Sequence, residues 1–253
     1  MRVFDNYADF YDLFYEDKDY NAEVNFIIDL AKINTNSQIK SVLDIGCGTG
    51  GHLIPFAKKG LKLTGFDLSE TMINQAREKI KKANINAEIS VNDVRTYRDG
   101  KKYDIIVAMF AVMGYLTSND DFFKSLKTAR IHLNENGLFI FDVWFGPAVL
   151  HEMPETRIQE FEKDGFRIIR LVRPEVDVVK QIVTVNYKIL KLEGKKVLEE
   201  VKETHRMRYF FIQEMKFFLE NADLKLVKVC PFMDSSKQPK IDDWNITVIS
   251  KNI

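Results

Sequence analysis

Residues 42–51 read VLDIGCGTGG, and this stretch decides the fold. The apolar run Ser41–Ile45 predicts a short buried strand, and residues 52–59 continue with a helical pattern that ends at Gly60. Glycines between a strand and a helix let the backbone turn tightly and approach a ligand closely. The start of the helix also offers unpaired N–H groups to an acidic ligand. The loop therefore predicts a ligand site at the end of a strand.

The spacing of these glycines fits two kinds of site. Gly46, Gly48 and Gly51 satisfy G-x-G-x-x-G, the pattern of dinucleotide-binding proteins. Gly46, Gly48 and Gly50 satisfy the tighter run G-x-G-x-G. Neither pattern alone identifies the ligand, and a turn that merely requires glycine gives the same letters.

Strand and helix patterns alternate on both sides of the glycine loop. The first 35 residues are expected to form two helices. Beyond the loop, the pattern predicts strands at 62–68, 87–91, 103–110 and 138–143. Helices are expected at 69–83, with Ser69 as N-cap, and at 120–133. This alternation predicts an α/β fold, a Rossmann-like, doubly wound and mostly parallel sheet with helices on both faces.

The pattern changes after Trp144. Alternating β-branched runs predict antiparallel strands at 167–172, 181–192 and 197–209. A helix at 212–221 and strands at 224–229 and 246–250 complete the expected elements. We therefore expect three parts, which are a cofactor-binding core with N-terminal helices at 1–150, a β insertion at 151–204 and the C-terminal part of the core at 205–253. The insertion is expected to form a substrate lid or wall, although an ordinary extension of the sheet fits the same pattern.

The composition is that of an ordinary globular protein. Of the 253 residues, 45% are hydrophobic and 29% charged, which suffices for a core without disulfides or metals. Basic and acidic residues both number 37, so the basic excess typical of nucleic-acid binders is absent. Met1–Tyr15 lacks the apolar region of a signal peptide, and no apolar run is long enough to span a membrane. We expect a cytoplasmic protein whose partner is a small molecule, with no nucleic acid and no membrane.

Three carboxylates are expected at the ends of neighbouring parallel strands. Asp44 precedes the glycines, Asp67 ends the next strand and Asp93 follows the third. At this edge of a sheet, Asp44 can meet a ligand ammonium, Asp67 the ribose hydroxyls of an adenosine cofactor and Asp93 an adenine amino group. An NAD-dependent oxidoreductase also fits the glycines and one acid, but it does not account for Asp44 and Asp93. For each acid, a local role as a turn or cap residue is the alternative.

At these residues the chain resembles the class I S-adenosylmethionine (SAM)-dependent methyltransferases. Residues 42–50 match their first motif, Asp67-Leu68-Ser69 with Met72 resembles the second and Asn92-Asp93-Val94 the third, within roughly residues 40–143. The resemblance implies SAM as cofactor, with the glycine loop at its methionyl part, Asp67 at the ribose and a backbone contact from Met109 to the methionyl amine. The cofactor-binding residues that it implies are Asp44, Gly46, Gly48, Gly50, Asp67, Leu68, Met72, Asp93 and Met109.

Nearly the whole chain is similar to a narrower group, the nucleotide-sugar N,N-dimethyltransferases that act on dTDP-3-amino-dideoxyhexoses. The matching motifs include Lys18-Asp19-Tyr20, Gly114-Tyr115-Leu116, Val143-Trp144-Phe145 and Glu203-Thr204-His205-Arg206. This resemblance implies methyl transfer to an amino group on a nucleotide-linked sugar. The chain departs from the group twice on the acceptor side. It has Tyr115 where those enzymes have a histidine, and residues 234–240 lack their glycine-rich arginine segment.

Residues on the acceptor side follow from the chemistry. A neutral amine is already nucleophilic, so the site must mainly align it and exclude water. Tyr115 can orient the amine or accept its proton, or else only wall the pocket. Trp144 is expected to stack on sugar or base, and His205 and Arg206 to contact sugar or diphosphate, with a solvated strand as the alternative. Tyr11 and Tyr20 are expected to fold over the cofactor, unless they are helix core.

Some properties stay open at the level of the sequence. The four histidines have no ligand spacing, so we expect no metal. An acceptor of another kind, methylated on oxygen or nitrogen, and SAM binding without catalysis are the remaining alternatives. A homodimer is compatible with the sequence, which does not fix the oligomeric state.

Overall fold

The structure, a computed structural model, describes residues 7–252. Residues 1–6 and Ile253, which belong to the expected first and last parts of the chain, lie outside the described residues. Within these residues the strands form two sheets. The strands of the large sheet are β1 (Ser41–Ile45), β2 (Lys62–Asp67), β3 (Ala87–Val91), β4 (Tyr103–Ala108), β5 (Leu133–Trp144), β10 (Leu224–Pro231) and β11 (Asn245–Asn252). The strands of the small sheet are β6 (Arg157–Lys163), β7 (Phe166–Asp177), β8 (Ile182–Glu193) and β9 (Lys196–Arg208).

The large sheet has the strand order β10-β11-β5-β4-β1-β2-β3. Neighbours among β1 to β5 pair in parallel, whereas β11 pairs antiparallel with both β5 and β10. This arrangement confirms the predicted α/β fold with a doubly wound, mostly parallel sheet. The direction of winding reverses between β1 and β4, and sheets of this type bind ligands beyond the carboxyl ends of the strands at such a point.

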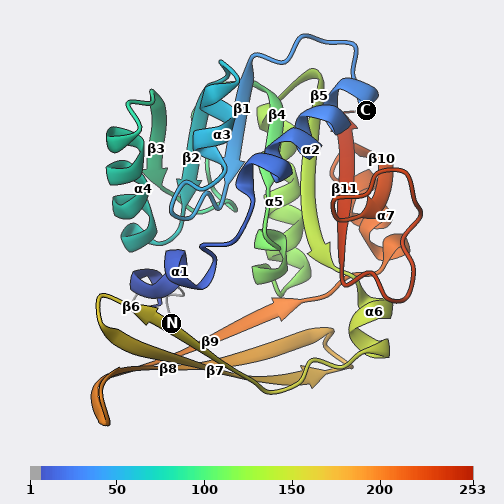
Figure 1. The fold of residues 1–253 in the computed structure, drawn as a ribbon. Helices are drawn as coiled ribbons and strands as arrows, with labels where there is room; N and C mark the ends of the chain where they lie inside the picture. Colours follow the sequence, from blue (N-terminus) through green and yellow to red (C-terminus); the bar gives the residue numbers. More distant parts are fainter. Residues whose placement is uncertain (1–6, 253) are drawn as a thin grey trace.

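Helices cover both faces of the large sheet (Figure 1). The helices are α1 (Ala8–Phe14), α2 (Tyr20–Asn34), α3 (Leu53–Lys58), α4 (Glu70–Lys82), α5 (Asn119–His132), α6 (Gly146–His151) and α7 (Ile212–Asn221), with a 3-10 helix η1 (Val112–Tyr115). Buried apolar residues of α2, α3 and α4 pack on one face, and those of α5 and α7 pack on the other. The 3.6-residue period of these apolar positions is what made the helices predictable.

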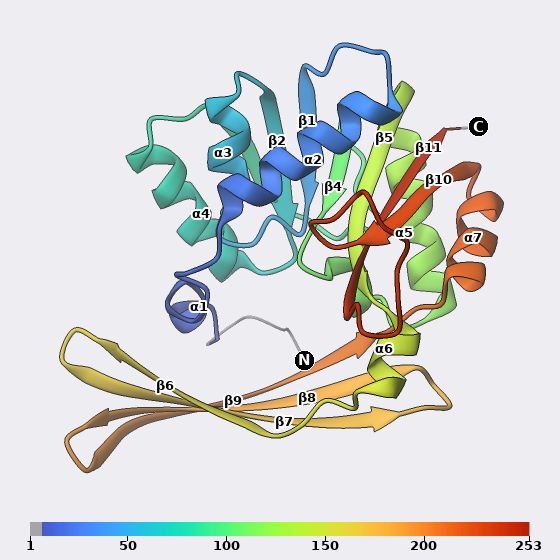
Figure 2. The ribbon, with the colours of Figure 1, turned by 45° about the vertical axis from the view of Figure 1, so that its right-hand side comes forward.

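The small sheet lies across the carboxyl ends of the parallel strands, with α1 between the two sheets (Figures 1 and 2). Phe10 and Phe14 of α1 pack against Ile168 and Ile189 of the small sheet. The antiparallel insertion therefore faces the edge of the large sheet where the sequence predicts the ligand. Its last strand, β9, continues past residue 204 to Arg208.

Two strand boundaries differ from the predictions. Strand β4 ends at Ala108 rather than at residue 110, because Phe110 (φ 71°) and Ala111 (φ 56°) adopt left-handed conformations that a strand does not accommodate. Strand β5 starts at Leu133 rather than at residue 138, with an irregularity in its pairing with β4 between Leu133 and Leu138.

Strand β6 and helix α6 were not predicted. β6 is almost entirely exposed and charged, so it has no apolar alternation to read. The proline in the first turn of α6 was an available start signal. Across residues 7–252, no helix has both the length and the apolar character needed to cross a membrane.

Candidate functional site

A cavity of about 610 Å³ lies between the carboxyl edge of the large sheet and the small sheet. Its volume is in the range of small-molecule sites, roughly 300–1,000 Å³. Most of the predicted site residues line it, namely Tyr11, Gly46, Gly48, Asp67, Leu68, Met72, Asp93, Met109, Tyr115, Trp144, His205 and Arg206. Asp44, Gly50 and Tyr20 do not line this cavity.

Asp67 joins the glycine loop to the start of α4. Its carboxylate accepts hydrogen bonds from the N–H groups of Gly48, at 3.0 Å, and Ser69, at 2.9 Å. Burial raises the pKa of Asp67, and these backbone hydrogen bonds oppose part of that rise. Gly46 has φ of 68°, and a Cβ there would lie 2.6 Å from the side chain of Val112. The loop thus needs glycine at this position both for its conformation and for its contact with η1.

Asp44 lies beneath the glycine loop and is 1% exposed. Its Oδ2 atom has no hydrogen-bond partner among the described residues. Burial raises the pKa of this carboxyl to about 7. A buried carboxylate oxygen without a partner is costly, and it fits the cationic amino-acid end of SAM.

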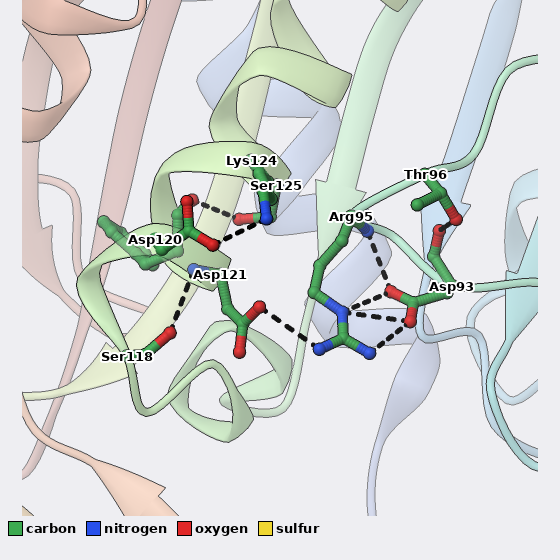
Figure 3. A network of polar contacts seen from close by, with 9 residues as sticks. Asp93, Arg95, Thr96, Ser118, Asp120, Asp121, Lys124 and Ser125 are labelled. Carbon is green, nitrogen blue, oxygen red and sulfur yellow. Dashed lines mark hydrogen bonds and ion pairs between the residues drawn. The ribbon is translucent and has the colours of Figure 1, made fainter.

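Asp93 is already engaged by an arginine that the sequence analysis did not single out. Figure 3 shows the Arg95 guanidinium between the carboxylates of Asp93 and Asp121. Arg95 Nε donates to both Asp93 oxygens, at 2.9 and 3.0 Å, and an Arg95 terminal nitrogen donates to Asp121 Oδ1 at 3.1 Å. These hydrogen bonds lower the pKa of Asp93, so the carboxylate stays ionised. The contact between Asp93 and adenine remains a prediction. Arg95, which binds Asp93, lines the same cavity.

A strained turn connects β4 to η1. The consecutive left-handed residues Phe110 and Ala111 follow Met109, which lines the cavity. Asp142, at the end of β5, accepts the N–H of Ala111 with both oxygens, at 3.1 and 3.0 Å. Burial raises the pKa of Asp142 to about 6. The sequence analysis missed Asp142, although an acid within a buried apolar strand is a sign of a specific partner.

Tyr115 and His205 were predicted separately, and the structure brings them together. Tyr115 Oη lies 2.8 Å from His205 Nδ1, and His205 Nε2 lies 2.5 Å from Glu203 Oε1. Burial raises the pKa of the Tyr115 phenol well above its usual range. Glu203 was not predicted, although it stands two residues from His205 and therefore on the same face of the strand.

The remaining predicted residues differ in their placement. Tyr11 lines the cavity, whereas Tyr20 packs against the glycine loop, where a Cβ on Gly51 would lie 2.5 Å from its ring. Trp144 borders the cavity beside Trp244, at 6.1 Å between ring centroids. Arg206 borders the cavity and is exposed.

Metal binding was also considered. In the part of the chain that the structure describes, no group of three or more His, Cys, Asp or Glu side chains is placed to hold a metal ion. The expectation of a metal-free site stays a prediction.

Comparison with known proteins identifies the glycine-loop domain. Residues 42–137 match the family model described as a methyltransferase domain. The dTDP-3-amino-3,4,6-trideoxy-α-D-glucopyranose N,N-dimethyltransferase of Streptomyces venezuelae is 35% identical over 144 residues. That match covers 56% of this chain and 59% of the relative, so the chain spans little more than half the length of this curated relative.

Two solved structures extend the likeness to the whole fold. A SAM-dependent methyltransferase from Clostridium acetobutylicum superposes with a TM-score of 0.82 at 23% identity, over 98% of each chain. DesVI of Streptomyces venezuelae superposes with a TM-score of 0.78 at 25% identity, over 96% of this chain and 97% of DesVI. The NAD-dependent alternative is set aside, since the family match points to SAM. Residues 42–137 therefore match a methyltransferase domain, and the fold around them is that of solved SAM-dependent methyltransferases.

Proposed function

We propose that the chain transfers a methyl group from SAM to the amino group of a small molecule, an amino sugar linked to a nucleotide. The observation that carries this proposal is the shape of the cavity. It is continuous from the glycine loop and Asp67 to Tyr115 and His205 on the acceptor side. A donor and an acceptor that are bound in one cavity can be held in the alignment that methyl transfer needs.

The residues around the glycine loop suit the cofactor. SAM supplies a methyl group on a positively charged sulfur. The orphaned oxygen of Asp44 offers a charge partner for the cofactor's ammonium. Asp67, at the carboxyl end of β2, is placed for the ribose hydroxyls, with Leu68 and Met72 as apolar walls for the adenine.

The residues of the acceptor side suit a polar molecule that carries an amine. Tyr115 and His205 place a phenol and an imidazole in the cavity, and Trp144 gives a flat surface for a sugar or a base. The small sheet closes this side, which supports its proposed role as a substrate wall that excludes water. The names of similar proteins support the acceptor class, because the Streptomyces venezuelae relative is a dimethyltransferase of a dTDP-3-amino sugar.

Product analysis by mass spectrometry tests this function. The purified chain is incubated with SAM and a panel of dTDP-3-amino sugars, in buffer that contains EDTA. We expect successive products with one and two added methyl groups, and turnover that EDTA does not reduce. The matched control is the dTDP sugar with a hydroxyl in place of the amine, which should stay unmodified. Methylation of that control, or of an unrelated acceptor only, would leave the SAM site standing and refute the amine acceptor.

A further inference from the structure

We propose that Tyr115, His205 and Glu203 form a proton relay in which His205 receives the proton that the acceptor amine releases. This inference deepens the proposed function and rests on it. The three side chains come from two elements that lie far apart in the sequence, since Tyr115 ends η1 and the other two lie on β9. They form one hydrogen-bonded series that begins at the cavity.

The hydrogen bonds fix the direction of the relay. An ionised glutamate only accepts hydrogen bonds, so His205 Nε2 carries the proton that points to Glu203 Oε1 at 2.5 Å. A neutral imidazole has one N–H, so His205 Nδ1 is then an acceptor. It accepts a hydrogen bond from the Tyr115 hydroxyl at 2.8 Å. Tyr115 lines the cavity, and a phenol oxygen that donates one hydrogen bond can also accept one, which here would come from an amine N–H.

The relay is enclosed by aromatic and charged groups. His205 is 2% exposed and Glu203 is 7% exposed. The Tyr7 N–H donates to Glu203 Oε2 at 3.4 Å. Among residues 7–252, the groups that face His205 include Glu203 on β9, Tyr115 on η1, Tyr7 ahead of α1 and Tyr187 on β8. Arg170 of β7 lies against the Tyr7 and Tyr187 rings. Glu203 is the carboxylate in this set, and its Oε1 atom lies 2.5 Å from His205 Nε2.

The proton balance of the reaction needs such an acceptor. As the acceptor nitrogen bonds to the methyl carbon, the carbon–sulfur bond of the donor breaks and the nitrogen becomes positively charged. The nitrogen then passes an N–H proton to Tyr115 Oη, while the phenol proton moves to His205 Nδ1. Tyr115 ends neutral and His205 ends as an imidazolium beside Glu203, until it returns the proton to solvent. A second methylation requires this step, because the nitrogen must regain its lone pair.

A tyrosine alone would serve poorly in this role. Burial holds the Tyr115 pKa well above the usual range of a phenol, so a standing phenolate is disfavoured. A histidine changes its charge near neutral pH, which makes it the suitable end of the series. In this arrangement Tyr115 touches the acceptor, while Glu203 acts through His205 as a positioning residue.

The variants His205→Gln, Glu203→Gln and Tyr115→Phe test the relay, with His132→Gln as the matched control. His132 is also buried and also lies beside a carboxylate, with its Nε2 3.2 Å from Asp99 Oδ1, but it does not line the cavity. The measurements are kcat and KM for the amine acceptor between pH 6 and pH 10, and the affinity for SAM by calorimetry.

We expect His205→Gln to lower kcat by about 10²-fold near pH 7, the usual contribution of one acid–base group. The loss should shrink as the pH rises, because the amine then sheds its proton directly to solvent. Glu203→Gln should lower kcat less than His205→Gln does, because the imidazole then loses the hydrogen bond that orients it but stays in place. Tyr115→Phe should lower kcat with its ring still in place. All variants should bind SAM as the wild type does, and His132→Gln should keep the wild-type profile.

Two outcomes overturn the relay. One is a pH profile of His205→Gln that matches that of His132→Gln while SAM still binds. The other is nitrogen-15 NMR of the wild type in which the proton of the neutral His205 ring resides on Nδ1, and this measurement needs no acceptor. Failure of the proposed function would look different. The wild type would then methylate a hydroxyl acceptor instead, and the same variants assayed on that acceptor would still decide whether His205 receives the proton.

Discussion

At the scale of single residues, the carboxylates around the glycine loop differ in what they bind. Asp67 is committed to two backbone N–H groups, those of Gly48 and Ser69. Asp44 keeps one buried oxygen without a partner among the described residues. The first therefore shapes the loop at the edge of the cavity. The second lies beneath the cavity lining, and its contact with a cation stays a proposal.

Replacing Asp67 by alanine tests its assignment to the ribose. Loss of the carboxylate leaves ribose hydroxyls unpaired and should weaken SAM binding by about 1–3 kcal/mol, as measured by calorimetry. The matched control is Asp104→Ala. Asp104 also accepts hydrogen bonds from two backbone N–H groups, those of Lys40 and Ser41, but it lies at the amino end of β4, away from the cavity. The control should lose stability and keep its SAM affinity. Wild-type affinity in a folded Asp67→Ala protein would show that the ribose lies elsewhere.

The site residues that the sequence revealed are those of local motifs. Asp44, Asp67 and the glycines stand at strand ends, where position along the chain already implies position in space. The sequence analysis did not identify Arg95, Asp142 and Glu203. Their roles depend on partners on other elements or on the face of the strand that carries them. The bond of Tyr115 to His205, for example, joins residues 90 positions apart. No local pattern encodes such a pair.

At the scale of elements, the turn between β4 and η1 sets the position of Tyr115. Two consecutive non-glycine residues in the left-handed region cost of order 1–3 kcal/mol each and persist only where the surroundings hold them. Asp142 stabilises this turn by accepting the hydrogen bond of the Ala111 N–H. The prediction that β4 continues to residue 110 was wrong for this reason, since apolar letters do not reveal a turn that a distant carboxylate stabilises.

Asp142→Ala should release this turn. The buried N–H of Ala111 loses its acceptor, which costs about 1–3 kcal/mol of stability. Displacement of Tyr115 should lower turnover by about 10²-fold, since misplacement by 1 Å can have that effect. Denaturant unfolding and steady-state kinetics measure the two effects. Asp142→Asn keeps one oxygen acceptor and should lose less of both. Turnover at the wild-type rate in both variants would mean that the turn does not depend on Asp142.

The regular elements were mostly predictable, and the exceptions have physical causes. Short apolar runs identified the parallel strands, and the apolar period of 3.6 residues identified the larger helices, because these strands are buried and these helices bury one face. β6 has exposed charges along most of its length and is fixed by pairing with β7 instead. Its strand conformation therefore depends on pairing with β7 rather than on its own sequence pattern.

At the scale of the whole molecule, residues from both sheets line the cavity. The large sheet contributes the glycine loop and Asp67, and the small sheet contributes Tyr187 and His205. We propose that SAM is held by the first and the acceptor by the second. Helix α1 packs its apolar side chains on the small sheet, and the hydrogen bond from Tyr115 to His205 links η1 to β9.

Hydrogen exchange of the whole protein tests this division. S-adenosylhomocysteine alone should protect peptides that cover residues 44–51 and 67–72. A nucleotide-linked amino sugar, added second, should extend protection to peptides of β8 and β9. Helix α7 does not line the cavity and serves as the internal control. Acceptor protection confined to the large sheet would show that the insertion is not the substrate wall.

We propose that the buried oxygen of Asp44 couples the protein's proton balance to the binding of a cationic ligand. Burial raises the pKa of Asp44 from 3.8 to about 7, so between these values the folded chain retains a proton that the unfolded chain has released. Its contribution to stability is present at low pH and fades as the pH rises through 7. An ammonium placed against this oxygen favours the ionised form instead. Occupation of the site therefore expels a proton below pH 7, and the affinity for a cationic ligand increases with pH as folding stability in its absence declines.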